Sequence, residues 1–272
     1  MLRDLASVAD SIREPNCRPS RTMTDESCRL CSGPGPLRDS HVIPECVYRP
    51  VYDSKHRAAA LDLRRAFIPY VQKGLRERLL CGTCEQKFGR WEHAFCRFWK
   101  PASLFGSPIT QPHFCVSGFP YDAFKLFHLS VLWRAGVATS EAFQLVKLGP
   151  HETHLRDILL KGQAPDDFVY PVSASILRDP ASGGPLEACV MASAAGRVNG
   201  VKTYVIIFAG CAWHYAASNS TNPFPEAQVL SRAGHFYLPV VDATSFPPLA
   251  KFMKTHAHLE TESSTRGRRV VS

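Results

Sequence analysis

Four cysteines in two closely spaced pairs are the residues of this sequence best suited to metal chemistry. Cys28 and Cys31 form one Cys-x-x-Cys motif, and Cys81 and Cys84 form a second one roughly fifty residues later, with a histidine between them. A Cys-x-x-Cys turn directs two thiolates toward one point, and zinc takes about four such ligands at roughly 2.3 Å. The spacing therefore predicts a tetrahedral zinc site that contributes to folding. The alternative is two unrelated turns with buried cysteines.

The residues around these cysteines predict a small fold that brings the two pairs together. Residues 37–43 and 75–80 are predicted strands, and Pro44 ends the first of them. Residues 84–99 are a predicted helix, because the apolar residues recur at helical spacing. A cysteine turn, a hairpin and a helix that shares the ligands make a treble clef, the ββα-metal arrangement. We expect this module to span residues 27–105.

The order of these motifs resembles the zinc-containing branch of the HNH endonuclease superfamily. The resemblance covers about residues 28–99 and rests on Cys-x-x-Cys, then Ser-His-Val-Ile-Pro-Glu, then Leu-Leu-Cys-x-x-Cys-Glu-Gln-x-Phe. It implies a metal-dependent endonuclease that hydrolyses DNA phosphodiester bonds, in a role such as bacterial defence against foreign DNA. It also implies DNA as the partner, Zn²⁺ as a structural ion, and Mg²⁺ or Mn²⁺ as the catalytic cation.

Particular residues match the positions of the family motif. The resemblance implies that His41 is the general base for the attacking water, since a neutral imidazole can accept a proton at cell pH. Glu85 matches the residue that opens the family's helix and would help hold the catalytic cation, with His93 as a further candidate ligand. Ser40 stands where catalytic members carry a metal-binding Asp or His. The alternative is a non-catalytic zinc-binding module for nucleic acid or protein, in which His41 braces the fold.

The positive charge of the chain is concentrated near the cysteine pairs. Residues 1–110 hold 18 Lys and Arg against 12 Asp and Glu (+6), whereas residues 111–272 hold 14 against 12 (+2). Such an excess attracts phosphate backbones. Basic residues alternate with tyrosines and phenylalanines over residues 49–78, which favours nucleic-acid contact, although an ordinary amphipathic segment over the zinc module is the alternative. The candidate contact residues are Arg64, Arg65, Lys73, Arg76 and Arg78.

The second half of the chain predicts an α+β domain over residues 110–257. Helices are expected at 121–137, which is apolar on most sides, at 140–146, where Ser140 would cap the first turn, and at 151–161. Four β-rich runs follow, at 168–177, 186–194, 201–209 and 211–217, and they predict an antiparallel sheet with the helices on one face. Arg134, His151 and Glu152 either brace helix ends or contact phosphates. An active site wholly within this domain is a third alternative.

The overall composition limits the class of protein. Apolar residues make up 45% of the chain and charged residues 21%, which excludes wholesale disorder. Residues 1–26 are expected to be a flexible arm and residues 258–272 a basic tail. The first residues lack the apolar segment of a secretion signal, and no stretch is long enough to span a membrane, so we expect a cytoplasmic protein. A protein partner or a homo-oligomer remains open. Five isolated cysteines are interpreted as small buried hydrophobic residues: Cys46, Cys96, Cys115, Cys189 and Cys211.

Overall fold

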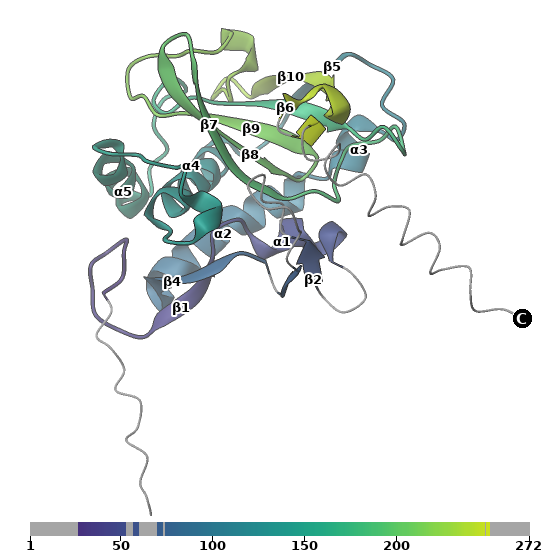
Figure 1. Cartoon of the computed structure of the whole chain (residues 1–272). Helices are drawn as coiled ribbons and strands as arrows, with labels where there is room; N and C mark the ends of the chain where they lie inside the picture. The colour runs from purple at the N-terminus through teal and green to yellow at the C-terminus, as the bar shows by residue number, and fades with distance from the viewer. Residues whose placement is uncertain (1–26, 53–56, 60–69, 73, 248, 251–272) are drawn as a thin grey trace, which may run out of the picture.

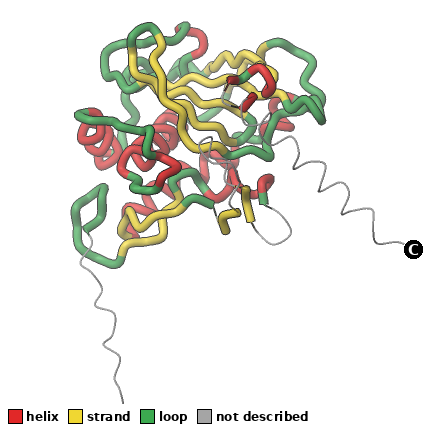
Figure 2. The backbone as a smooth tube through the Cα atoms, in the orientation of Figure 1, coloured by secondary structure: helices red, strands yellow, loops and turns green. Residues whose placement is uncertain are grey.

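A six-stranded sheet and a layer of helices make up most of the molecule. A computed structural model of the chain describes residues 27–52, 57–59, 70–72, 74–247 and 249–250. Helices α2 (Gly82–Phe98), α4 (Tyr121–Val137) and α5 (His151–Lys161) all lie on the same side of the sheet (Figure 1, Figure 2). The predicted α+β class is confirmed. The predicted arm over residues 1–26 and the tail over residues 258–272 lie outside the described residues.

A short hairpin-like ladder precedes α2 and fixes the positions of the cysteine turns. β1 (Leu37–His41) pairs antiparallel with β4 (Arg76–Cys81), and β4 runs directly into α2. Leu37 and Ser40 point inward from β1, while Leu79 and Leu80 are buried on β4. The strands predicted at 37–43 and 75–80 and the helix predicted at 84–99 are therefore confirmed. Between β1 and β4 lie α1 (Glu45–Tyr48), η1 (Arg49–Val51), β2 (Arg57–Ala59) and β3 (Tyr70–Gln72).

The six strands of the main sheet follow the order β5-β10-β6-β9-β8-β7. The four predicted β-rich runs correspond to β6, β7, β8 and β9, and these strands pair antiparallel as predicted. The sheet as a whole is mixed, because β10, which lies outside those runs, pairs parallel with β6. β10 follows β9 in the chain but does not pair with it. It enters the sheet between β6 and β5 instead, in the direction that runs parallel to β6. The bounds are β5 (His113–Ser117), β6 (Val172–Arg178), β7 (Met191–Val198), β8 (Val201–Phe208), β9 (Cys211–Ala216) and β10 (His235–Asp242).

One buried core connects the cysteine-bearing part of the chain with the sheet. The ring of Phe95 on α2 stacks on Phe127 of α4 with 4.0 Å between centroids, and it also contacts Trp213 of β9 edge-on. Gly136 is required in α4 because a Cβ atom there would lie 2.1 Å from the Leu148 side chain. The predicted division into domains at residues 105–110 stays a prediction, and the hydrophobic core continues across it. The remaining short elements are α3 (Pro101–Phe105), η3 (Glu226–Gln228) and η4 (Ala243–Ser245).

The helix predicted at 140–146 is a single 3₁₀ turn, η2 (Glu141–Phe143). The Ser140 side chain makes no capping hydrogen bond, and its Oγ has no partner among the described residues. The Glu77 carboxylate on β4 instead accepts hydrogen bonds from the backbone amides of Thr139 and Ser140, at 2.8 and 2.7 Å. A carboxylate from another element thus satisfies the amides that a cap would have served. The helices predicted at 121–137 and 151–161 are confirmed.

The buried amine of Lys125 on α4 makes stability depend on pH. Its Nζ donates to the backbone oxygens of Asp167 and Tyr170, each at 3.0 Å, and desolvation lowers its pKa from 10.5 to about 7. Between these two values the unfolded chain binds more protons at this residue than the folded chain, so stability rises with pH. We expect the free energy of unfolding to rise by about 2 kcal/mol from pH 7 to 9 through this group.

Urea unfolding at both pH values, with Lys125→Met as the comparison, measures this contribution. Methionine has a similar length and no charge, so the variant is expected to lose the rise that Lys125 causes while keeping all other titrations. An equal rise in both proteins would show that Lys125 is not its source.

Candidate metal centre and active site

The four predicted zinc ligands form one cluster. Cys28 and Cys31 lie in the turn before β1, Cys81 ends β4, and Cys84 lies in the first turn of α2. Their four sulfur atoms all lie within 4.8 Å of one another, and the Sγ atoms of Cys31 and Cys81 are 3.8 Å apart. Zinc–sulfur bonds of 2.3 Å give a tetrahedron with edges of about 3.8 Å. The four cysteines can therefore hold a metal ion such as zinc.

The backbone around the first pair holds it in a tight turn. The amide of Ser32 donates to the Cys28 carbonyl at 2.8 Å, and Ser32 has a positive φ of 59°. The amide of Gly33 donates to the Cys31 Sγ at 3.4 Å. Hydrogen bonds from backbone amides to sulfur favour the thiolate, which is the form that binds metal. Within the cluster, a backbone hydrogen bond from Cys84 lowers the pKa of Cys81 to about 7, whereas burial raises the pKa of the Cys84 thiol. The donor set and its hydrogen bonds suit a structural zinc ion.

His41 lies at the end of β1, next to the cysteine-bearing helix, and contacts a carboxylate. Its Nε2 makes a short contact with the carboxylate of Glu45 and accepts a hydrogen bond from Arg76 Nε at 2.9 Å. Glu45 is held in turn by the Tyr52 hydroxyl at 2.9 Å and by Arg76 at 3.3 Å. Glu45 was not among the predicted site residues. Its position four residues after His41, in Ser-His-Val-Ile-Pro-Glu, was the available signal.

Glu85 contacts Ser40 rather than His41. Ser40 is fully buried, and its hydroxyl donates to Glu85 Oε2 at 2.6 Å. The exposed Asp39 lies beside them, since Asp39 and Glu85 line the same surface hollow of about 400 Å³. The structure thus joins Glu85 to the unusual serine of the motif.

A second group of metal ligands is not present in the part of the chain that the structure describes. There, the four cysteines are the one set of three or more His, Cys, Asp or Glu ligand atoms close enough to share an ion. His93 lies eight residues after Glu85 on α2, about 12 Å along the helix axis. It faces a different hollow, between α1 and α2, so it does not join Glu85.

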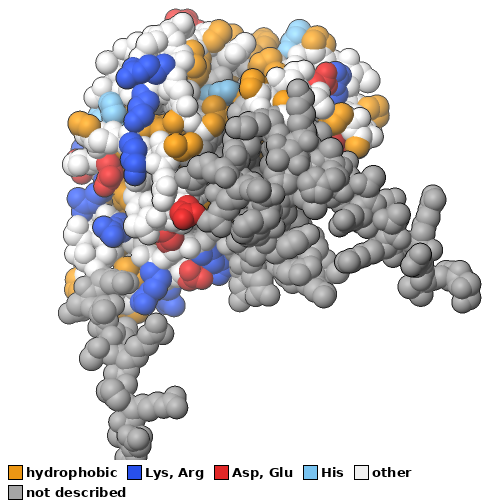
Figure 3. All heavy atoms as spheres, viewed as in Figure 1, with side chains coloured by type: hydrophobic (Ala, Val, Ile, Leu, Met, Phe, Trp, Pro, Cys, Tyr) orange, Lys and Arg blue, Asp and Glu red, His pale blue; other side chains and the backbone are white. Residues whose placement is uncertain are grey.

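The predicted nucleic-acid contacts are only partly within the described residues. Arg64, Arg65 and Lys73 lie outside them. Arg76 lies beside His41 and also contacts Asp39 at 3.4 Å, so it belongs to the His41 cluster. Arg78 is exposed on β4. On the face shown in Figure 3, other lysine and arginine side chains gather over the β7–β8 hairpin.

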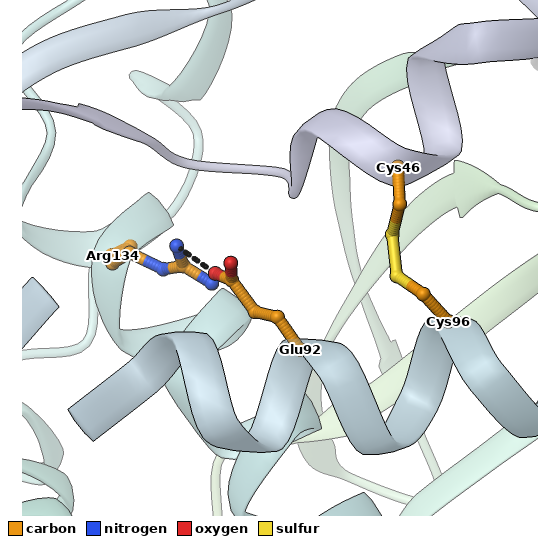
Figure 4. The surroundings of a disulfide bond; sticks show 4 residues. All are labelled: Cys46, Glu92, Cys96 and Arg134. Atoms are coloured by element: carbon orange, nitrogen blue, oxygen red, sulfur yellow. Dashed lines mark hydrogen bonds and ion pairs between the residues drawn. A yellow bond between two sulfur atoms is a disulfide. The ribbon is translucent and has the colours of Figure 1, made fainter. Parts of the chain in front are cut away.

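Arg134 on α4 anchors the backbone of His41 to the rest of the fold in a way that the sequence did not specify. Its side chain is fully buried, and its guanidinium donates to the His41 carbonyl oxygen at 2.5 Å. It also donates to Glu92 of α2 at 2.7 Å (Figure 4). Arg134 therefore braces β1 against two helices. His151 likewise contacts the Tyr170 hydroxyl, at 3.1 Å. Of the two interpretations of these residues, the described contacts favour bracing over phosphate binding.

A disulfide joins the two walls of the hollow that His93 faces. Cys46 of α1 and Cys96 of α2 are bonded, with Cα atoms 6.3 Å apart (Figure 4). Their interpretation as isolated hydrophobic residues is wrong, because the fold places two residues that are distant in sequence at bonding distance. Cys115 is exposed, which also contradicts that interpretation, whereas Cys189 and Cys211 are buried as predicted.

Removing the disulfide is expected to lower the free energy of unfolding by about 2–4 kcal/mol, because it closes a loop of some 50 residues in the unfolded chain. A bound metal would close an overlapping loop, which favours the lower end of this range. Urea unfolding of Cys46→Ser/Cys96→Ser measures the loss, and Cys115→Ser serves as the control. Equal stabilities of the double variant and the parent protein would contradict the expectation.

Comparisons with known proteins add no relatives: no family model, curated protein or solved structure matches the chain. Among the described helices, none has the length and apolar character needed to cross a membrane.

Proposed function

We propose that this chain is a metal-dependent endonuclease of the HNH type that hydrolyses phosphodiester bonds in DNA. In this proposal the cysteine turn, β1, β4 and α2 form a zinc-stapled treble clef. The observation that carries the proposal is the contact between His41 and Glu45 at the end of β1, beside the helix that carries Cys84 of the cluster. A histidine oriented by a carboxylate is the arrangement expected of a general base.

The contacts of His41 suggest how the proton would move. Arg76 Nε donates to Nε2 in the structure, so this step requires Arg76 to release that nitrogen. Nε2–H can then donate to Glu45, and Nδ1 takes the proton from water. The resulting hydroxide attacks phosphorus as the bond to the leaving oxygen breaks. The Glu45 carboxylate then stabilises the imidazolium, and the Arg134 hydrogen bond to the His41 carbonyl keeps the ring's backbone in place.

A divalent cation such as Mg²⁺ or Mn²⁺, when bound, would neutralise charge on the phosphate. Glu85 and Asp39 offer oxygen ligands of the kind that such ions prefer, and both line one hollow. His93 is left out of this assignment because it faces the other hollow. The Ser40 hydroxyl, which donates to Glu85, would hold that carboxylate in position.

Nicking of supercoiled plasmid in the presence of Mg²⁺ or Mn²⁺ tests the proposal. His41→Ala is expected to lower the rate by about 10²–10⁴-fold, the usual contribution of a general base. The variant should keep its zinc content and melting temperature, and a chelator of Mg²⁺ should stop the reaction of the parent protein. Nicking that persists in His41→Ala would refute the assignment of the base.

The second candidate is a zinc-binding module without catalysis. The contacts around Ser40 and His41 favour this candidate. The Ser40 hydroxyl donates to Glu85, and the Arg76 guanidinium donates to the His41 ring. Salt-sensitive DNA binding without nicking under any divalent cation would support this candidate over the endonuclease.

A further inference from the structure

A groove between α1 and the second half of α2 begins at the residue that orients His41. Its volume is about 730 Å³, within the range of about 300–1,000 Å³ that is common for ligand sites. Its lining includes Glu45 as well as Lys100 and Pro101, which follow α2. The Cys46–Cys96 disulfide joins its two walls. The groove is therefore a fixed surface that leads away from the His41 cluster.

One side of α2 supplies most of a wall of this groove. Gly89, His93, Cys96 and Arg97 lie at positions i, i+4, i+7 and i+8, which places them on one face of the helix, and Lys100 follows the helix end. Among the described residues, nothing lies within 4 Å of a Cβ atom built on Gly89. In this part of the structure the groove is thus open above the middle of α2.

Three exposed cations line the groove: Arg49 from η1, Arg97 from α2, and Lys100 after it. Among the contacts between described residues, none of the three takes part in an ion pair or a side-chain hydrogen bond. Two of the acidic residues in the lining are already neutralised, because Glu45 contacts Arg76 and Glu92 contacts Arg134. Glu187 is the remaining acid, so the groove carries an excess of unpaired positive charge.

These cations are better explained by a ligand than by the fold. Arg97 and Lys100 interact favourably with the C-terminal end of α2, but such an interaction is weak for exposed side chains. It does not account for Arg49, which belongs to a different element on the opposite wall. The basic residues over the β7–β8 hairpin differ, because Arg197 and Lys202 donate to backbone oxygens of Gly200 and Lys147.

We propose that this groove binds the phosphodiester backbone of DNA and leads it to His41, with Arg49, Arg97 and Lys100 contacting phosphates. The identity of the ligand rests on the proposed endonuclease function, whereas the charge and shape of the groove do not. This surface differs from the set of basic residues that the sequence predicted, which is centred on residues 64–78.

Binding of a fluorescently labelled DNA duplex, without added divalent cation, separates this proposal from catalysis. Arg97→Glu and Lys100→Glu are each expected to weaken binding at least tenfold, and removing one phosphate contact should reduce the slope of log K against log salt by about 0.9. Arg197→Glu, on the far hairpin, makes the same change in net charge and should leave the affinity within twofold.

A steric variant tests the groove without altering charge. Gly89→Phe places an aromatic ring in the open space above α2 and is expected to weaken DNA binding at least tenfold while zinc content and melting temperature remain. If both this variant and the charge reversals bind DNA as the parent protein does, the groove is not the binding surface.

The outcomes distinguish the two proposals. If the charge reversals abolish DNA binding but the parent protein does not nick DNA, the proposal of the DNA-binding groove is supported and the proposal of the endonuclease is rejected. If those variants bind DNA normally and nicking depends on His41, the proposal of the endonuclease is supported and the proposal of the DNA-binding groove is rejected. Tighter binding of an RNA of the same sequence through the same residues would overturn the assignment to DNA.

Discussion

Cys84→Ser is expected to prevent metal binding by the four-cysteine cluster and to cause a large loss of stability. Cys84 is buried at the start of α2, and it is the ligand that connects the helix to the cysteine turn. Structural zinc contributes about 10–16 kcal/mol of apparent binding free energy in small zinc-finger peptides. The loss here should be smaller, because α2 also packs on α4 and is held by the disulfide.

Metal analysis and thermal unfolding together measure this effect. We expect one zinc ion per chain in the parent protein, less than one in Cys84→Ser, and a much lower melting temperature for the variant. Removal of zinc from the parent protein with a strong chelator should reproduce the shift. Cys189→Ser, which changes a buried cysteine outside the cluster, should keep its zinc. Full zinc content in Cys84→Ser would exclude the four-cysteine site.

Arg134→Met is expected to lower the free energy of unfolding by about 3–5 kcal/mol, the usual cost of breaking a buried ion pair. The substitution leaves the Glu92 carboxylate and the His41 carbonyl oxygen without the donor that both now share. Arg134 has no exposed surface, whereas Glu92 is partly exposed and can be reached by water, which places the loss at the low end of this range. The methionine side chain fills part of the volume, so the loss reflects the polar contacts more than a cavity.

A double-mutant cycle with Glu92→Gln identifies the source of this loss. Glu92→Gln alone should also be destabilising, since it leaves a buried cation without its counter-charge. The double variant should lose less than the sum of the two single variants, because the pair is removed as a unit. Urea unfolding provides the values. Additive losses, or a loss below about 1 kcal/mol for Arg134→Met, would mean that the pair contributes little.

The helices and the cysteine cluster could be predicted because their signals are local. Apolar spacing and the breaks at Gly149 and Pro150 gave the bounds of α4 and α5, and two short motifs gave all four cysteines of the cluster. β10 lies outside the four predicted β-rich runs, and it contains Pro239, which weakens a strand prediction. The structure tolerates this proline where the strand changes partner, from β5 at residues 235–239 to β6 at residues 240–242.

The contacts that organise the candidate active site could not be predicted, because each of them depends on tertiary structure. Arg134 is separated from His41 by 93 residues, and Cys46 from Cys96 by 50. No pattern in the sequence marks either pair. Glu45 is the exception, since it lies within the motif itself and needed only the turn of α1 to reach His41.

The disulfide and the cysteine cluster together constrain the order in which the protein can mature. Six cysteines meet around α2 and its neighbours, and six thiols can pair completely in 15 ways, of which only three contain the Cys46–Cys96 bond. Thiolates bound to a metal are withdrawn from random oxidation, which would leave Cys46 and Cys96 as the pair that remains to react. Metal uptake before oxidation would therefore avoid scrambled isomers.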